Sequence, residues 1–222
     1  MDSVAAPSEF SRVRRQPARA AYDRATIDAI LDAAMIGHVG VLRAGRPVVI
    51  PMLFGRHGDH LYLHGSVASQ LLRGLSTGID VCFTATLIDG LVYARSVFHH
   101  SMNYRSVVVV GRAAAVDGDE KLLGLRAVVD HITPGRWDEA RVPSDGELRL
   151  TAVLRLPITE ASAKVRTGGP VDEPDDVDLP VWAGQVPVVA TFADPVDADD
   201  LRLPLPVSPA VHRLGHGPAA LQ

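Results

Sequence analysis

Apolar side chains recur with a helical period in two segments of the chain. In segment 24–35 they fall at every third or fourth position, which is the pattern of a helix with one buried face. Asp23 or Thr26 would cap this helix. Segment 119–132 repeats the pattern and is followed by a Pro-Gly pair that stops it, so we expect a second helix there. A shorter helix is expected over 68–75.

Over most of the remaining chain the apolar positions change to a period of two, which is typical of strands. Turn residues separate the runs, and the Asp-Gly pair at 89–90 predicts a tight hairpin. The expected strands cover residues 38–43, 48–54, 60–65, 79–88, 91–98, 104–116 and 147–158. About six strands in close succession, with only short helices between them, indicate a mainly β (α+β) fold built on a closed or partly closed antiparallel barrel.

Composition divides the chain into three parts. Residues 1–20 are rich in Ala, Pro, Arg and Ser without periodicity, and we expect a flexible N-terminal arm. Residues 21–192 hold the expected helices and strands and form a single domain. Residues 193–222 follow a Pro- and Asp-rich stretch and are expected to form an extended, partly loose tail.

Charge and hydropathy narrow the possible functions. The 222 residues carry 22 Lys and Arg against 26 Asp and Glu, which argues against a nucleic-acid partner because such partners need a dense basic surface. No apolar run approaches the roughly 20 residues that cross a bilayer. No apolar signal core follows Arg14 and Arg15, so we expect a cytoplasmic protein without a membrane partner. Cys82 is the single cysteine; we expect it in the core and expect no metal site.

A polar face on one expected strand is the first candidate for chemistry. His60, Tyr62 and His64 alternate with leucines and so share one strand face. Gly65 and Ser66 then turn the chain into the short helix, and such a turn offers N–H groups and hydroxyls to an anion. An ordinary strand–turn–helix connection is the alternative. A metal bound by His60 and His64 lacks a third ligand.

The stretch FHHSMNYRSVVVVG, residues 98–111, places a polar run directly before one of the most apolar strands. Its hydrogen-bonding side chains are Ser101, Asn103, Tyr104, Arg105 and Ser106. Some of them could bind the polar edge of a heterocycle, and Arg105 would attract a phosphate. A polar loop that leads into the outer face of a strand is the alternative. His99 and His100 are adjacent, which argues against a metal pair because neighbouring strand residues point oppositely.

Two later segments carry further candidates. Lys164 and Arg166 lie on the same side of an extended segment that leads into Gly168 and Gly169, where glycine permits a close backbone approach. Trp182 lies in a Pro-flanked apolar segment and can stack on a ligand ring or pack within the fold. Solvated charges and simple packing are the alternatives at these two places.

Together these segments resemble one family in order and spacing. The motifs LYLHGS, DGLVYARSVFHHSMNYRSVVVVG, KVRTGGP and LPVWAGQVP resemble those of the flavin-nucleotide-binding branch of the pyridoxamine 5′-phosphate oxidase-like split barrels, which includes the nitroimidazole-resistance reductases. The resemblance covers about residues 24–187. It implies a six-stranded split β-barrel with short flanking helices, a homodimer, and FMN bound in two clefts between the subunits.

The resemblance also suggests which residues lie near FMN. They are His64, Gly65, Ser66, Ser69, Gln70, Arg73, Ser101, Asn103, Tyr104, Arg105, Ser106, Lys164, Arg166 and Trp182. Pro51 and Met52 would supply an apolar wall for the flavin ring. Gln70 departs from the family, whose members often carry Lys or Arg there, and one lost charge-assisted contact costs about 1.5–3 kcal/mol. His64 matches a histidine near the flavin in the nitroimidazole-reductase branch and is a candidate proton donor.

The resemblance implies an FMN-dependent oxidoreductase that passes hydride or electrons from a reductant, such as NADH or NADPH, to a small organic oxidant. A nitroaromatic or quinone-like substrate fits this class. Oxidation of pyridoxamine 5′-phosphate itself does not, since the C-terminal arginine-rich motif is absent from the sequence. The alternatives are a flavin carrier without turnover and a barrel that holds haem or a deazaflavin. His99 and His100 keep haem among them.

Overall fold

The structure, a computed structural model, describes residues 8–69 and 78–216. Its strands are β1 (Ala20–Ala21), β2 (Ile36–Arg43), β3 (Arg46–His57), β4 (His60–Ser66), β5 (Ile79–Tyr93), β6 (Ser101–Val116), β7 (Thr151–Pro157), β8 (Glu160–Arg166) and β9 (Gly184–Pro187). Its α-helices are α1 (Arg24–Ala33), α3 (Gly118–Ile132), α4 (Asp145–Leu150) and α5 (Pro209–His216). Short 3-10 helices are η1 (Pro17–Arg19), η2 (Val97–His99), η3 (Arg136–Glu139) and η4 (Pro174–Asp176). The short helix expected at 68–75 lies largely outside the described residues.

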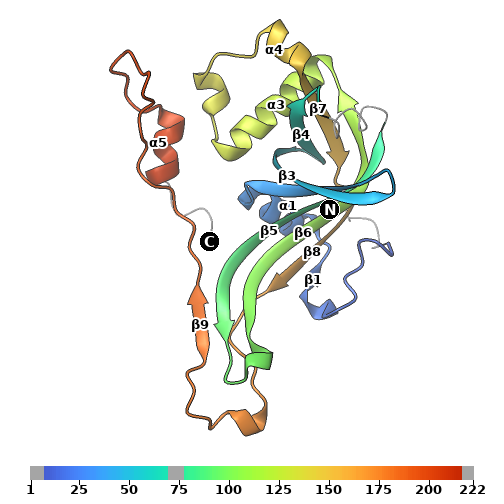
Figure 1. The fold of residues 1–222 in the computed structure, drawn as a ribbon, viewed down its shortest axis with the longest axis vertical. Helices are drawn as coiled ribbons and strands as arrows, with labels where there is room; N and C mark the ends of the chain where they lie inside the picture. Colours follow the sequence, from blue (N-terminus) through green and yellow to red (C-terminus); the bar gives the residue numbers. More distant parts are fainter. Residues whose placement is uncertain (1–7, 70–77, 217–222) are drawn as a thin grey trace.

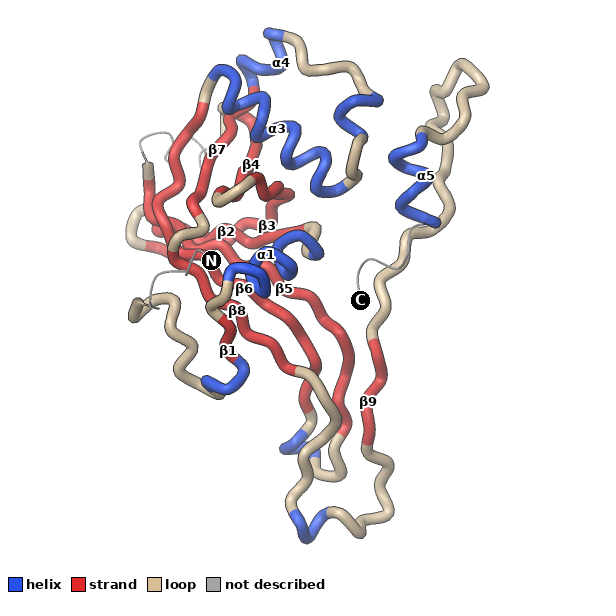
Figure 2. The backbone as a smooth tube through the Cα atoms, turned by 180° about the vertical axis from the view of Figure 1, so that it is seen from behind, coloured by secondary structure: helices blue, strands red, loops and turns tan. Residues whose placement is uncertain are grey.

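Six strands close into a ring, which confirms the mainly β antiparallel fold (Figure 1). The order around the ring is β6–β7–β4–β3–β2–β5, and β5 pairs back to β6. The pairing of β2 with β5 stops at Ala85, but β5 and β6 stay paired to Val92 opposite Ser101. A two-stranded ribbon therefore projects beyond the ring (Figure 2). Strands β8 and β1 continue the sheet from β6, and β9 continues it from β5.

The ring encloses the main hydrophobic core. Phe54 and Phe83 meet edge to face inside it, with ring centroids 4.9 Å apart. Helix α1 adds the buried side chains Ile27, Ile30 and Leu31 to the same core. Burying a side chain of this size contributes about 1.5–3 kcal/mol, so α1 is part of the barrel's support rather than an appendage.

The two helices expected from periodicity are both present. Helix α1 begins after Asp23, whose carboxylate accepts a hydrogen bond from the backbone N–H of Thr26 at 2.8 Å. Asp23, not Thr26, is therefore the cap. Helix α3 covers the outside of β3, β4 and β7, and a second cluster of buried residues lies beneath it. Its members are Tyr62, Val116, Leu125, Val128 and Val153.

The hairpin predicted at Asp89 and Gly90 is wrong, because β5 continues through both residues. The register with β6 shifts at this point, so the two residues form a bulge in place of a turn. Contacts with distant segments decide the outcome. Asp89 pairs with Arg105 of β6, and a Cβ on Gly90 would lie 3.1 Å from the carbonyl oxygen of Val186 in β9. The chain reverses instead at residues 94–100.

The strand predicted over 147–158 begins later than expected. Its first residues belong to α4, which starts with a capping box: Ser144 and Glu147 each accept a hydrogen bond from the other's backbone N–H. The Ser-x-x-Glu spacing is the sequence signature of that motif. Strand β7 then begins at Thr151, and its apolar alternation matches the pattern that the sequence showed.

The C-terminal region leaves the barrel and returns to it. After β9 the chain runs extended through residues 189–207, here called the strap, and ends in α5 (Figure 1). Helix α5 is held at η3: the carboxylate of Glu139 accepts from the N–H of Ala210 at 2.9 Å, and Arg136 donates to the hydroxyl of Ser208 at 2.9 Å. The predicted tail over 193–222 therefore includes an ordered helix.

We expect Gly55→Ala to destabilise the fold. A Cβ on Gly55 of β3 would lie 2.3 Å from the carbonyl group of Ala127 in α3, and this backbone cannot rotate away. Overpacking of this kind costs about 1–3 kcal/mol, which urea unfolding would measure as a lower free energy of unfolding. Gly146→Ala is the control, since the nearest atom to a Cβ there, Nη2 of Arg149, lies 3.8 Å away. An equal loss in both variants would contradict the role of close packing.

Candidate functional site

His64 lies near the end of β4, and burial favours its neutral form. Its side chain is half-buried, its Nδ1 atom is buried without a hydrogen-bond partner, and burial lowers its pKa. The turn after it forms as predicted, but the N–H of Ala68 donates to the Ser66 hydroxyl and that of Ser69 donates to the Ser66 carbonyl. Those two N–H groups are therefore already satisfied within the turn. The predicted phosphate contacts Gln70 and Arg73 lie outside the described residues.

The polar residues of β6 and β8 form a buried network. The guanidinium of Arg166 donates to the side-chain oxygen of Asn103 and to the carbonyl oxygens of Gly168 and Gly169, at 3.0 and 3.2 Å. Asn103 in turn donates to the side-chain oxygen of Gln185 in β9 at 2.9 Å. The Nε atom of Arg166 is buried without a partner, and burial lowers the pKa of the group. A buried cation held by neutral acceptors favours an anion nearby.

Arg105 is less available to a phosphate than the sequence suggested. It forms a two-point ion pair with Asp89, at 2.7 Å from Nη2 and 3.0 Å from Nε, and this hydrogen bonding raises its pKa. Its neighbours on β6 face β8: Tyr104 stands opposite Arg166, and Ser106 stands opposite Lys164. The register therefore brings these four residues together within one chain, while the charge of Arg105 is balanced locally.

Pro51 and Met52, predicted to form one apolar wall, lie on opposite faces of β3. Met52 packs against the main core, whereas Pro51 is exposed together with Val49 and Leu53. Since successive side chains of a strand alternate, Pro51 alone is placed to face a ligand outside the barrel.

Trp182 lies beside the tip of the β5–β6 ribbon. Its ring is two-thirds exposed, and its centroid lies 6.0 Å from that of Tyr93, which contacts His100 at 5.5 Å. The Nδ1 atom of His100 lies 3.1 Å from the carbonyl oxygen of Ser96, and His99 lies 3.5 Å from a glutamate carboxylate. Both histidines are thus engaged by protein groups.

In one chain the predicted residues form two separate groups. His64 lies opposite Val153 of β7, which lies opposite Val116 at the end of β6. Tyr104 and the Arg166 network belong to the other end of β6. The 12 positions from Tyr104 to Val116 correspond to about 40 Å of strand. A small ligand held by one group therefore does not reach the other within the same chain.

Comparison with known proteins identifies the fold family. A family model described as pyridoxamine 5′-phosphate oxidase matches residues 23–165, which include every strand of the ring. The chain belongs to this family. The resemblance found in its motifs is therefore confirmed, and its ring is the split barrel of the pyridoxamine 5′-phosphate oxidase-like proteins.

Two solved structures match the chain almost throughout. The flavocytochrome Anf3 from Azotobacter vinelandii is 41% identical, with 94% of this chain and 98% of that one covered and a TM-score of 0.87. The FAD and haem binding protein from Mycobacterium smegmatis is 35% identical, with coverage of 89% and 97% and a TM-score of 0.85. A protein described as a 5-nitroimidazole antibiotic resistance protein from Bacteroides thetaiotaomicron is 26% identical, with coverage of 66% and 86% and a TM-score of 0.55. No curated protein matches the sequence.

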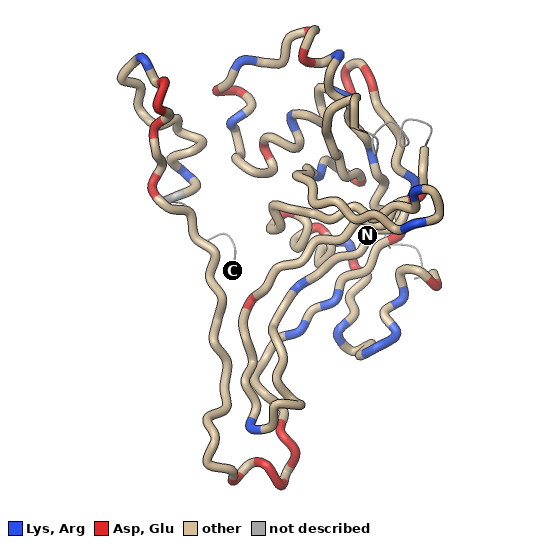
Figure 3. The backbone as a smooth tube through the Cα atoms, in the orientation of Figure 1, with Lys and Arg blue, Asp and Glu red and all other residues tan. Residues whose placement is uncertain are grey.

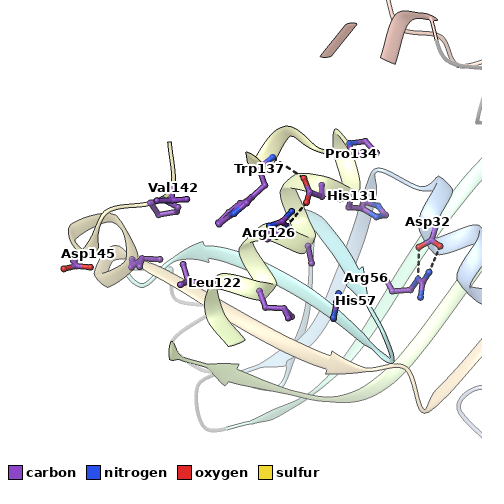
Figure 4. Close-up of a pocket in the computed structure, with 15 residues that line it drawn as sticks. Asp32, Arg56, His57, Leu122, Arg126, His131, Pro134, Trp137, Val142 and Asp145 are labelled. Carbon is purple, nitrogen blue, oxygen red and sulfur yellow. Dashed lines mark hydrogen bonds and ion pairs between the residues drawn. The ribbon is translucent and has the colours of Figure 1, made fainter. Parts of the chain in front are cut away.

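This pyridoxamine 5′-phosphate oxidase-like chain also has a cavity of about 870 Å³ beside α3 (Figure 4). Its apolar lining includes Leu122, Trp137 and Val142, and two of its charged residues, Arg56 and Asp32, pair with each other at 2.5 Å. None of the residues predicted from the sequence lines it. Sequence reasoning missed the cavity because its walls come from α1, β3, α3 and α4, with no shared motif.

The described residues show neither a cluster of metal ligands nor a membrane-spanning helix. Within 8–69 and 78–216, no cluster of three or more His, Cys, Asp or Glu side chains is arranged to hold a metal ion. In the same ranges, no helix combines the length and apolar character needed to cross a membrane.

We expect His64→Gln to make the free energy of unfolding of the cofactor-free protein less dependent on pH on the acid side. Burial lowers the pKa of His64 in the folded chain, whereas the unfolded value is about 6.5. Below that pH the unfolded state binds more protons, so the stability present above it is lost as the pH falls toward the folded pKa. Urea unfolding from about pH 8 to pH 5 measures the slope. His57→Gln, at an exposed position, is the control; an unchanged slope in the His64 variant would contradict the burial effect.

Proposed function

We propose that the chain is a flavin- and haem-binding redox protein, a flavocytochrome. The observation that carries this proposal is the 41% identity with a flavocytochrome over 94% of the chain. The 35% identity with an FAD and haem binding protein supports the same pair of cofactors. Since a fold alone does not determine function, each cofactor needs residues in this chain that fit it.

The network around Arg166 fits an anionic flavin nucleotide. Arg166 is buried, its Nε has no partner, and the acceptors that hold it are neutral. The phosphate of FMN, or the two phosphates of FAD together, would carry a charge of about −2 at neutral pH and would balance Arg166 and Lys164, which lie two positions apart on the same strand. Tyr104 lies opposite Arg166 and offers a hydroxyl to the same ligand. In this arrangement Asn103 positions Arg166 rather than binding the flavin directly.

His64 is the residue that would hold a haem iron. Iron binds the neutral imidazole through a ring nitrogen, and burial lowers the pKa of His64 and so favours its neutral form. Since Nδ1 is buried, the other ring nitrogen, Nε2, would be the one to bind the iron. His99 and His100 fit less well because protein groups engage both. An imidazole that ligates iron does not also deliver a proton, so this assignment replaces the proton-donor role suggested by the sequence.

The flavin is proposed to be FAD. The sequence motifs suggested FMN, but the Mycobacterium smegmatis relative is named for FAD. FAD contains the ring and phosphate of FMN, so the residues assigned to FMN serve both. The deazaflavin alternative gains no support from the names of the two most fully covered relatives.

We also propose that the protein is a homodimer whose sites form between subunits. The His64 group and the Arg166 group lie toward opposite ends of β6, so a second copy is needed to bring one of each together. Apolar side chains on the outer face of β2, β3 and β5 are exposed and would be covered by this copy. They are Ile36, Leu42, Val49, Leu53 and Ile88.

A bound flavin supplies two-electron chemistry and a haem supplies one-electron chemistry. The chain's own residues would bind and orient these groups: Arg166 and Lys164 would face the negative charge of the flavin nucleotide, and His64 would hold the iron. The reductant is proposed to be NADH, NADPH or a protein donor, and the substrate a small oxidant. A carrier without turnover would hold the cofactors without being reoxidised by such a substrate.

We expect the purified protein to show flavin absorbance bands and a Soret band. Heat release of the flavin followed by chromatography would identify FAD or FMN. Bleaching by NADH or NADPH, and recovery on addition of a nitroaromatic, a quinone or oxygen, would distinguish an enzyme from a carrier. A colourless protein that takes up neither FAD nor haem on titration would overturn the proposal.

We expect His64→Ala to lose the Soret band, with haem affinity at least ten-fold lower, and to keep its flavin. His57→Ala and His131→Ala are matched controls, because both residues line the separate cavity beside α3. Haem titration followed at the Soret maximum is the measurement. Loss of haem from a control variant, with His64→Ala unaffected, would instead assign the haem site to that cavity.

A further inference from the structure

The strap exposes apolar side chains along its whole length. Every residue from 185 to 207 is exposed. Many of the exposed strap residues are apolar, as is typical of a surface that another molecule covers. The exposed apolar residues of the strap are Val189, Phe192, Val196, Leu201, Leu203, Leu205 and Val207. At full extension its 19 residues span roughly 60 Å. A soluble chain seldom leaves such a run in water unless another molecule packs on it.

Both ends of the strap are fixed to the barrel of the same chain. At one end β9 pairs with β5 over Gly184–Pro187, and at the other end Ala210 and Ser208 bind η3. Between them the backbone hydrogen bonds are local, from Leu201 to Ala198 and from Leu205 to Leu203. The strap is therefore held in position beside the barrel (Figures 1 and 2) without being buried by it.

The exposed area of the chain suits a large homodimer. Its accessible surface is 14073 Å², whereas a folded monomer of 23.7 kDa exposes about 9,800 Å². The difference is about 4,200 Å². Obligate homodimers bury about 2,000–5,000 Å² in total, shared between the two subunits. The extra surface of one chain is therefore larger than the half of such an interface that one subunit contributes.

Charge is segregated in a way that a second copy would complement (Figure 3). The strap carries four exposed aspartates, at 194, 197, 199 and 200, against one arginine. The N-terminal segment 12–19 carries four arginines and no acid, and lies on the other side of the barrel from the strap. Because the two charged segments lie on opposite sides of the barrel, a contact between them would form with a second copy rather than within one chain.

From these observations we infer that the strap clasps a second copy of this chain, with its acidic section seated on the partner's basic segment 12–19. The inference rests on the proposed homodimer and adds the surface that holds it together. Two-fold symmetry forms the contact twice, once from each strap. The apolar strap residues supply buried area, and the charges fix the register and orientation of the copies.

The test is charge reversal in the full-length protein. We expect Asp197→Lys with Asp199→Lys to raise the dimer dissociation constant at low salt at least ten-fold, measured by sedimentation equilibrium. If the dimer is too tight to dissociate on dilution, the rate of subunit exchange is measured in place of the dissociation constant. Adding Arg14→Glu and Arg15→Glu to the same chain restores opposite charges at the four exchanged positions, and should restore the dimer to within about three-fold.

Asp175→Lys with Asp178→Lys is the matched control, since it changes the net charge equally at exposed positions of another acidic loop. This variant should dimerise like the wild type. Val196→Ser with Leu203→Ser tests the apolar part and should also weaken the dimer. All of these side chains are exposed in the single chain, and circular dichroism would show that each variant folds.

Three results would overturn the clasp: a monomeric wild type, a strap variant that dimerises normally, or a charge swap that fails to restore association. A monomeric wild type would leave the strap to a different partner. Sedimentation tests the clasp and absorbance tests the cofactors, so one proposal can fail while the other stands. An intact dimer without colour contradicts the cofactors alone, whereas a coloured monomer contradicts the assembly.

Discussion

The pairing of β5 with β6 is the interaction on which the rest of the structure depends. It closes the six-stranded ring and then continues beyond it as a ribbon. The projecting part of β6 brings Asn103 and Tyr104 to β8 and its Arg166, while the projecting part of β5 offers the edge on which β9 pairs. The polar network, and the starting point of the strap, both follow from a hairpin longer than the barrel requires.

The Arg166 network is hard to explain by stability alone. A buried guanidinium loses its hydration, and neutral acceptors compensate that loss less well than a carboxylate. An apolar side chain of similar volume would often be as stable. Departures from the rule that buried charges are paired tend to occur at functional sites. The Nε atom of Arg95 is also buried without a partner, but Arg95 pairs with the carboxylate of Asp172 at 2.8 Å. The lack of a carboxylate partner, rather than the unpartnered Nε, therefore sets Arg166 apart.

Local patterns predicted most of the fold but not the contacts between distant segments. Helix α1 follows from the spacing of Ile27, Ile30 and Leu31, since a helix is encoded within a few turns of sequence. The bulge at Asp89 was mistaken for a turn because the contacts that keep it in the strand come from β6 and β9. In the same way the motifs identified Arg105 as a candidate anion ligand from its residue type, while its ion pair with Asp89 depends on strand register. The sequence pattern identifies candidate residues, whereas strand pairing determines which of their side chains are available to bind a ligand.

On the proposed function, cofactor binding and assembly are one property of the chain. Each subunit offers the imidazole of His64 near one end of β6 and, near the other end, the buried guanidinium of Arg166, which has no carboxylate partner. The two groups are far apart within one chain. Electron exchange between two cofactors requires them to lie near each other, so the useful pair would form across the seam between copies. A strap anchored at both ends on its own barrel would then act on redox chemistry from a distance, because whatever separates the copies also separates the cofactors.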